Sequence, residues 1–338
     1  MTDRGVTPRH RGRRLGAAIA LLSTLVGGFA PGNADGAVAP AVPAPGLVTG
    51  DVTVHDPSMV RTPGGYLLLS THNGIEARTS ADRIGFRRAS AALAQVPWWV
   101  RLYNPDGDVW APDVSFHNGI YRLYYSASSF GSNRSAIGLA TSTTGAPGSF
   151  VDRGVVYRSS TRDNYNAIDP SLLVDPKTGR WWLSFGSHWS GIHMIAIDPA
   201  TGMQSSTDRT RYHLARRPEA PNAVEAPSII ARDGWYYLFT SFDTCCRGTS
   251  STYRIMVGRA ISPTGPYVDR SGRRLLDGGG TEILASHGRV IGPGGQSVMH
   301  DVDGELLVYH YYDAEAGGRE TLGVNLLGWD AAGWPYVR

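Results

Sequence analysis

The run Ile168-Asp169-Pro170-Ser171-Leu172, followed by the aromatic segment Arg180-Trp181-Trp182-Leu183-Ser184-Phe185, is the clearest copy of a unit that occurs five times along the chain. Each copy opens with a turn and a short apolar run, and an aromatic-rich segment follows. The opening prolines are about 55 to 66 residues apart, a period typical of a four-stranded propeller blade. The other openings are His55-Asp56-Pro57-Ser58-Met59, Trp110-Ala111-Pro112-Asp113-Val114, Glu225-Ala226-Pro227-Ser228-Ile229 and, more loosely, Gly292-Pro293-Gly294-Gly295-Gln296-Ser297-Val298.

The aromatic segments of these units predict β-strands. Tyr, Trp, Val, Ile and Thr dominate them, and Gly, Asn and Asp lie at their ends. No long stretch places apolar residues at helical spacing, so we expect almost no helix. Five such units predict an all-β fold, a five-bladed β-propeller with its site at the central channel, and a β-sandwich is the main alternative. The predicted aromatic strands are residues 65–70, 120–126, 180–185, 234–240 and 305–310.

The first 34 residues have the pattern of a secretory signal peptide. Four arginines between residues 9 and 14 precede an apolar stretch at 15–30, and small residues follow it. That stretch is short for a bilayer span of about 20 residues, which disfavours the alternative of a membrane anchor. We therefore expect 1–34 to be a signal peptide, 35–50 a Pro/Ala linker and 51–338 the propeller of a secreted, extracellular protein.

The charge of the chain depends on this leader. The whole sequence carries 32 basic and 29 acidic residues, a formal net charge of +3. Residues 1–34 contain five Arg and one Asp, so the remainder carries 27 basic residues against 28 acidic ones. The remainder therefore has no electropositive excess of the kind that binds nucleic acid. We expect a monomer with no nucleic-acid partner and no membrane association after signal removal.

The two cysteines of the chain, Cys245 and Cys246, are adjacent. They cannot connect distant segments, and no Cys-x-x-Cys pattern indicates zinc or haem. In an oxidising compartment they can form a vicinal disulfide, and two buried free thiols are the equal alternative. A phosphate-binding loop and a serine nucleophile elbow also find no support in the sequence.

Three acidic residues, Asp56, Asp169 and Glu225, stand at the opening turns. Because the innermost strands of a propeller converge on its axis, equivalent turns of successive units face one another. We therefore expect the three carboxyls to meet in one site, although a single Asp-Pro is more often only a turn. Hydrolysis of a glycosidic bond needs a protonated acid at the leaving oxygen and a carboxylate on the opposite face. Burial and like charges raise the pKa of one carboxyl so that it stays protonated.

Several runs around these turns resemble the motif set of the glycoside hydrolase family 43 arabinanases, in order over essentially the whole chain after the leader. The resemblance implies an inverting glycosidase with Asp56 as general base and Glu225 as general acid. Asp169 would tune the pKa of that acid and orient the sugar. The runs are His55–Ser58, Trp110–Asp113, Ser128–Ser132, Asn166–Pro170, Gly186–Gly191, Val224–Pro227 and Cys245–Gly248.

The same resemblance implies a substrate cleft and an ion. Trp110 and Phe130 would wall the sugar pocket, because an aromatic ring packs well against the C–H face of a sugar. His310 would reach the central channel and help hold an ion, most often calcium, largely through water. The alternative for His310 is an ordinary core histidine, and no organic cofactor is implied. The other residues expected along the cleft are His55, Gly131, Asn166, Ala167, Ile168, Ser187, His188 and Trp189.

Two positions depart from the family pattern. Gly295 stands where the family often has a histidine, and His188 stands where it often has an aromatic residue. The first leaves the surroundings of the ion open, and the second lies beside the expected path of the substrate. Neither change touches the three carboxyls.

The resemblance implies hydrolysis of α-1,5-linked L-arabinan, and we expect internal (endo) cleavage. An exo-acting α-L-arabinofuranosidase or a β-xylosidase of the same family would keep the same carboxyls and differ in whether the cleft is open at both ends. A carbohydrate-binding propeller without catalysis is the third interpretation. The presence of all three carboxyls argues against it.

Overall fold

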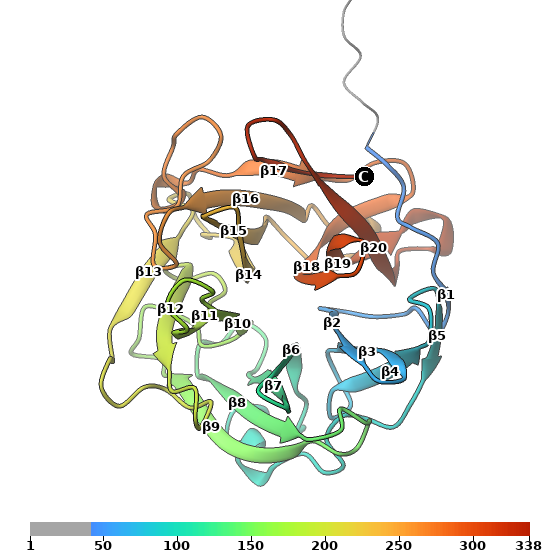
Figure 1. Cartoon of the computed structure of the whole chain (residues 1–338), viewed down its shortest axis with the longest axis vertical. Helices are drawn as coiled ribbons and strands as arrows, with labels where there is room; N and C mark the ends of the chain where they lie inside the picture. Colours follow the sequence, from blue (N-terminus) through green and yellow to red (C-terminus); the bar gives the residue numbers. More distant parts are fainter. Residues whose placement is uncertain (1–41) are drawn as a thin grey trace, which may run out of the picture. The chain divides into compact units, whose positions relative to one another are not determined.

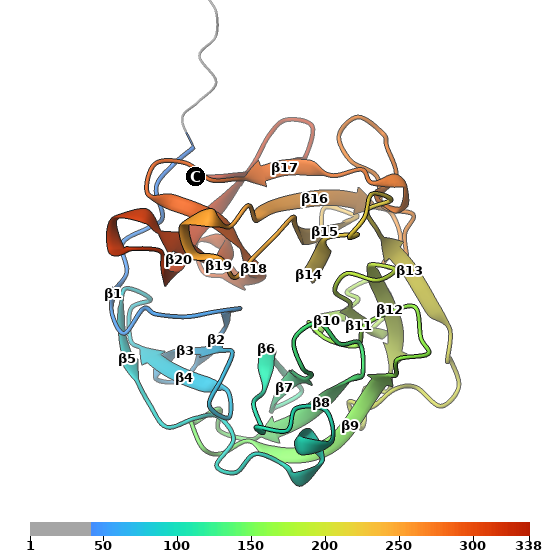
Figure 2. The ribbon, with the colours of Figure 1, turned by 180° about the vertical axis from the view of Figure 1, so that it is seen from behind.

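Residues 42–338 are the part of the chain that the computed structural model describes, and they form five sheets arranged as blades around one axis (Figures 1 and 2). Each blade is a meander of four antiparallel strands that runs outward from the axis, so the predicted five-bladed β-propeller is confirmed. The predicted signal peptide, 1–34, and the first part of the predicted linker, 35–41, lie outside the described residues.

The strands follow the chain in order around the ring. Blade 1 consists of β2 (Ser58–Thr62), β3 (Gly65–Ser70), β4 (Glu76–Ser80) and β5 (Gly85–Arg88), with β1 (Thr49–Gly50) added in parallel at its rim. Blade 2 consists of β6 (Trp110–His117), β7 (Ile120–Ala127), β8 (Ser135–Ser142) and β9 (Val151–Ser159). Blade 3 consists of β10 (Ser171–Val174), β11 (Trp181–Phe185), β12 (Ile192–Ile197) and β13 (Arg211–Ala215). Blade 4 consists of β14 (Val224–Arg232), β15 (Trp235–Phe242), β16 (Arg254–Ala260) and β17 (Thr281–Leu284). Blade 5 consists of β18 (Val290–Asp301), β19 (Gly304–Asp313), β20 (Arg319–Trp329) and β21 (Pro335–Val337).

The described residues contain no α-helix, as the sequence predicted. The helical elements in this range are short 3-10 turns, and none is long and apolar enough to cross a bilayer. They are η1 (Trp98–Leu102), η2 (Gly248–Ser250), η3 (Leu275–Asp277) and η4 (Ala314–Ala316).

The five predicted aromatic segments are the second strands of the five blades, and both of their faces are buried. Successive side chains of a strand point to opposite faces of the sheet. In β15, Tyr236 and Leu238 pack toward blade 3, whereas Tyr237 and Phe239 pack toward blade 5. A strand between two apolar faces needs a continuous run of large side chains, which explains the aromatic pattern.

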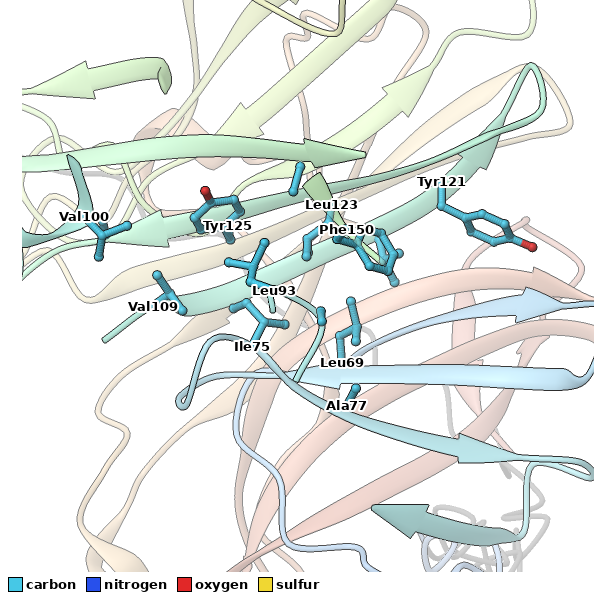
Figure 3. Packing of buried hydrophobic residues seen from close by; sticks show 14 of the residues in the cluster. Leu69, Ile75, Ala77, Leu93, Val100, Val109, Tyr121, Leu123, Tyr125 and Phe150 are labelled. Carbon is cyan, nitrogen blue, oxygen red and sulfur yellow. The ribbon is translucent and has the colours of Figure 1, made fainter. Parts of the chain in front are cut away.

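Five apolar clusters fill the spaces between neighbouring blades. Figure 3 shows the cluster between blades 1 and 2, where Leu69 and Ile75 face Leu123 and Tyr125. Phe150 closes the same cluster beside Leu123. Because each blade is clamped on both sides, the ring holds its inner strands at fixed positions around the axis.

Polar contacts connect the inner strands to each other. Ser58 Oγ accepts the Val114 N–H of the next blade at 3.0 Å, and Ser228 Oγ accepts the Val298 N–H at 3.2 Å. The Ser297 hydroxyl donates to the carbonyl oxygen of Pro57 at 2.9 Å and so links blade 5 back to blade 1. In blades 1, 4 and 5 the serine that follows the opening turn therefore satisfies a backbone group of the neighbouring blade.

The N-terminal part of the described chain helps to close the ring. The Gly46 N–H donates to Val324 O at 2.9 Å, and the Leu322 N–H donates to Val52 O at 2.8 Å. Strand β1 also pairs with β5 inside the stretch that the sequence placed in the linker. Residues 42–50 are thus hydrogen-bonded to the propeller, which extends the folded part to positions before residue 51.

We predict that Ser58→Ala lowers the free energy of unfolding by about 1–3 kcal/mol, because it leaves the buried Val114 N–H without an acceptor. Chemical denaturation of the variant and the wild type measures this difference. Ser206→Ala is the matched control at an exposed serine and should change stability by less than about 0.5 kcal/mol. Equal stability of the two variants would contradict the structural role of the Ser58 hydroxyl.

Candidate active site

A cavity on the propeller axis is lined by the opening turns of all five blades. At each turn one residue has a left-handed backbone, which directs the chain into the inner strand. The φ values are +47° at Asp56, +43° at Ala111, +58° at Asp169, +52° at Ala226 and +56° at Gly295. Such values are uncommon for residues other than glycine and persist only where surrounding contacts hold them.

The left-handed residue that recurs at each turn shows that the sequence analysis aligned the fifth unit wrongly with the other four. The first four left-handed residues each precede a proline, but Gly295 precedes Gln296, so Pro293 is not the equivalent of the other opening prolines. A Cβ atom at Gly295 would lie 2.4 Å from Asp56 Oδ1 and 2.7 Å from His310 Nδ1. Only glycine fits here, which gives a physical reason for this departure from the family pattern.

Donors and a histidine surround the Asp56 carboxyl. His55 Nδ1 lies 2.9 Å from Asp56 Oδ2, and the Thr71 hydroxyl donates to the same oxygen at 2.8 Å. Burial alone would raise the pKa of Asp56, but the charge and hydrogen bond of His55, together with the Thr71 hydroxyl, hold it well below its usual range. Burial also disfavours the charge of His55, yet Asp56 raises the pKa of His55 to about 9. Asp56 is therefore an ionised carboxylate at neutral pH.

The surroundings of Asp169 and Glu225, by contrast, raise the pKa of each carboxyl. Burial, followed by the charges of Glu225 and Asp56, raises the pKa of Asp169 well above its usual value, and only the Ala226 N–H at 3.0 Å opposes the shift. Burial likewise raises the pKa of Glu225, against the opposing effects of His188 and Ser187. Carboxyls whose pKa values are separated by their surroundings can accept a proton at one position and donate it at another.

Two residues of the loop after β11 contact Glu225, as the sequence led us to expect for the cleft. The Ser187 hydroxyl donates to Glu225 Oε2 at 2.5 Å. His188 Nε2 lies 3.8 Å from the same oxygen, so the histidine at the second departure from the family pattern interacts with a carboxyl. Trp189, the next residue, is partly exposed, and its backbone φ of +43° continues the left-handed turn of His188.

His310, on β19, is fully buried against Asp56 and His55. The Asp56 N–H donates to its Nδ1 at 3.1 Å, and its ring stacks on that of His55 with centroids 4.0 Å apart. Its Nε2 is buried and has no hydrogen-bond partner among the described residues. An unpaired buried nitrogen beside a carboxylate fits a water or a hydrated ion at this point, and ligand atoms of His55, Asp56 and His310 lie within 4.8 Å of one another.

The other predicted cleft residues differ in their burial and contacts. Trp110 is held by Asp108, which accepts its Nε1–H at 2.8 Å. Phe130 is 90% exposed on the loop between β7 and β8, next to the exposed Gly131. Asn166 is buried, and its Oδ1 accepts the Ser135 hydroxyl at 2.6 Å.

Ala167 is a correction to the predicted cleft. Its side chain is fully buried in the apolar cluster between blades 2 and 3, so it cannot contact a substrate. Its neighbour Ile168 is also largely buried, and its carbonyl oxygen accepts the Gly186 N–H at 2.8 Å. The chain before Asp169 therefore holds the turn in place mainly from inside the core.

The sequence interpretation missed several residues of the site. Asp113 lines the same cavity, and its Oδ2 accepts the Leu172 N–H at 2.9 Å. Burial raises the pKa of Asp113 to about 7, although that hydrogen bond opposes the shift. Thr71 was missed because it lies after β3 and not in an opening turn. A hydroxyl near the end of the second strand, which recurs as Ser126 and Ser241, was the signal that could have revealed it.

The adjacent cysteines form a disulfide at the edge of the site. Cys245 and Cys246 are bonded to each other, which decides between the two alternatives left open by the sequence. The Cys246 N–H donates to the Tyr312 hydroxyl oxygen at 2.7 Å, and His55 Nε2 lies 3.4 Å from that oxygen. The disulfide is thus joined through Tyr312 to the histidine beside Asp56.

Comparison with known proteins assigns the family. The sequence pattern of the glycosyl hydrolases family 43 matches residues 48–335, nearly all of the described chain. The chain belongs to this family. It is therefore a glycoside hydrolase, and the resemblance seen in the opening turns is confirmed.

Individual family 43 relatives share the same fold. The chain is 43% identical over 288 residues to the extracellular endo-α-(1→5)-L-arabinanase 1 of Bacillus subtilis (strain 168), covering 83% of this chain and 87% of that protein. It is 38% identical to the extracellular exo-α-(1→5)-L-arabinofuranosidase ArbA of Cellvibrio japonicus, covering 85% and 86%. The solved endo-arabinanase of Bacillus licheniformis superposes with a TM-score of 0.80 at 42% identity, covering 86% of this chain and 99% of that one.

We predict that Ser187→Ala raises the pKa of Glu225 further in this family 43 enzyme. The Ser187 hydroxyl stabilises the ionised carboxylate, so its loss favours the protonated form. A titration followed by NMR of 13C-labelled glutamate carboxyls measures the pKa directly, with Ser206→Ala as the control. An unchanged or lower Glu225 pKa in Ser187→Ala would contradict the assigned hydrogen bond.

Proposed function

We propose that this protein is a secreted, inverting, endo-acting hydrolase of α-1,5-linked L-arabinan. The observation that carries the proposal is that the carboxyls of Asp56, Asp169 and Glu225, from three blades, lie close enough to affect one another's pKa, with Asp56 and Asp169 on the axial cavity. The arabinan specificity is supported by the named relatives, among them a structure of the Cellvibrio cellulosa α-L-arabinanase complexed with arabinohexaose, 36% identical with a TM-score of 0.80 and covering 85% of this chain and 96% of that one.

In the proposed mechanism Asp56 is the general base. It stays ionised because His55 and Thr71 stabilise its charge, so it can take a proton from a water molecule that attacks the anomeric carbon. Glu225 is the general acid on the other side of the sugar, where burial favours its protonated form. As the glycosidic bond breaks, Glu225 gives its proton to the leaving oxygen.

Asp169 acts on both the acid and the sugar in this proposal. The charge of Glu225 raises the pKa of Asp169, so the two carboxyls interact, and the Ala226 N–H fixes one oxygen of Asp169. The other oxygen is then available to a sugar hydroxyl. Trp110, with Phe130, Ser187, His188 and Trp189 on neighbouring loops, would form the walls of the cleft.

We further propose that the channel holds a hydrated ion, most simply calcium, at His310. Because Nδ1 accepts the Asp56 N–H, the unpaired Nε2 carries the imidazole proton and would contact the ion through a bound water. When bound, the ion would supply positive charge that favours the ionised form of Asp56. Calcium titration by calorimetry, with His310→Ala as the comparison, tests this: saturable binding in the wild type alone supports it, and equal heats oppose it.

The proposed location and the proposed assembly are those expected from the sequence. The leader pattern at 1–34 and the extracellular relatives support secretion. A monomer is proposed because the blades satisfy one another within one chain.

We predict that Glu225→Gln lowers the rate of arabinan hydrolysis by about a hundredfold to ten-thousandfold, the usual contribution of a general acid. The substitution keeps the shape of the side chain, so the melting temperature should stay close to that of the wild type. Reducing-end release from linear arabinan measures the rate. Activity near that of the wild type would remove the assignment of Glu225 as the acid.

The product profile distinguishes endo from exo cleavage, which matters because one relative is named an exo-acting enzyme. We predict that linear arabinan is first cut to oligosaccharides of mixed length and that xylan is not cut. Chromatography of samples taken over time measures chain length. A single short product from the earliest samples would favour the exo-acting alternative, and activity on xylan alone would favour the β-xylosidase.

A further inference from the structure

The loop Thr71–Ile75, between β3 and β4, lies between the inner ends of blades 1 and 2. The Thr71 N–H donates to His55 O at 3.0 Å, and the His72 N–H donates to Val109 O at 2.9 Å. Ile75 is fully buried in the cluster between the same two blades. The loop is thus attached on one side to the segment that carries Asp56 and on the other to the segment that leads to Trp110.

The Thr71 hydroxyl has a defined donor direction. Its oxygen accepts the Ala111 N–H at 2.9 Å, and the residue is almost completely buried. A hydroxyl has one proton to donate, and the Asp56 Oδ2 atom lies 2.8 Å away to accept it. The Ala111 N–H therefore fixes the oxygen of Thr71, and Thr71 in turn fixes one carboxylate oxygen of Asp56.

Equivalent hydroxyls in other blades accept the backbone N–H of the next blade, as Thr71 does, but do not donate to a catalytic carboxylate. Ser126 Oγ accepts the Asp169 N–H at 3.0 Å, and Ser241 Oγ accepts the Gly295 N–H at 3.0 Å. The Ser241 proton goes to Gln296 Oε1 at 2.7 Å. Acceptance of the N–H of the next blade is therefore a shared structural feature, whereas donation to Asp56 is an addition made by Thr71.

The other end of the loop fixes the indole ring of Trp110. His72 Nδ1 lies 2.6 Å from Asp108 Oδ2, and the Asn73 N–H donates to Asp108 Oδ1 at 3.3 Å. The oxygen that His72 contacts also accepts the Trp110 Nε1–H at 2.8 Å. The orientation of the indole is thus set by Asp108, which His72 and Asn73 of the same loop hold in place.

We propose that loop 71–75 is a positioning element that sets the base against the sugar-binding wall: Thr71 aims the Asp56 carboxylate, and Asp108, held by His72 and Asn73, aims the Trp110 ring. The inference rests on the proposed function of this site. It assigns two positioning residues, Thr71 and Asp108, that act through Asp56 and Trp110 and need not touch the substrate.

Thr71→Val tests whether Thr71 positions the Asp56 carboxylate, because valine keeps the shape of threonine and removes the hydroxyl. On linear arabinan we expect kcat to fall about tenfold to a hundredfold, with KM changed by less than about twofold, since an aligned charge-assisted hydrogen bond is lost. Thr71→Ser keeps the hydroxyl and should restore kcat to within about threefold of the wild type. Should Thr71→Val fail to fold, Thr71→Ala replaces it in the same comparison.

Ser142→Ala is the control, because it removes a buried hydroxyl that accepts a backbone N–H, that of Gly145 at 2.9 Å, at the end of β8 opposite to the opening turn. We expect its melting temperature to fall about as much as that of Thr71→Val while its kcat stays near the wild-type value. Equal losses of kcat in the two variants, or no rescue by Thr71→Ser, would overturn the role of Thr71. Wild-type protein inactive on arabinan would instead overturn the proposed function, so the two failures are distinguishable.

A double-mutant cycle tests whether Asp108 positions the Trp110 ring. Trp110→Phe keeps a ring but removes the N–H, and Asp108→Ala removes its acceptor. If Asp108 acts through the indole, each substitution raises KM for linear arabinan severalfold and the double variant is no worse than Asp108→Ala. Additive increases in KM, or an unchanged KM in Asp108→Ala, would overturn the role of Asp108.

Discussion

The active site depends on a left-handed backbone residue at the head of each inner strand. Asp56, Ala111, Asp169, Ala226 and Gly295 all adopt this conformation on the cavity wall. Their backbones are held by contacts from neighbouring strands, such as the Thr71 hydroxyl on Ala111 N–H and the Ser126 hydroxyl on Asp169 N–H. The apolar clusters between blades keep those strands at fixed distances. Side chains more than 100 residues apart in sequence therefore reach one cavity.

Within that cavity the partners of each carboxyl decide its protonation. Asp56 receives a histidine and a hydroxyl, so its charge is stabilised despite burial. Burial and like charge favour a proton on Asp169, which only the Ala226 N–H opposes, and burial outweighs His188 and Ser187 at Glu225. Acid and base are thus set by neighbours and not by residue type, since two aspartates on one axis behave in opposite ways.

Much of this was accessible from the sequence. The proline period and the aromatic strands predicted five blades because a strand clamped between two apolar faces needs large side chains along its whole length. The same period brought the three carboxyls together. The position of the fifth opening turn was predicted wrongly because Gln296 stands where the other turns have proline. Ala167 was wrongly placed in the cleft because a motif does not say which side of the backbone faces the core. Thr71, Asp108 and Asp113 each make a contact between blades, and the hydroxyl that recurs near the end of the second strand pointed to Thr71 alone.

The central claim is that Asp56 activates water on one face of the sugar while Glu225 protonates the leaving oxygen on the other. Proton NMR of the reducing sugar during the first moments of hydrolysis of a short α-1,5-arabino-oligosaccharide tests it most directly. Single displacement by water predicts that the β-anomer appears first and the α-anomer only later by mutarotation. Initial accumulation of the α-anomer would mean retention through a covalent intermediate and would contradict the roles assigned to both carboxyls.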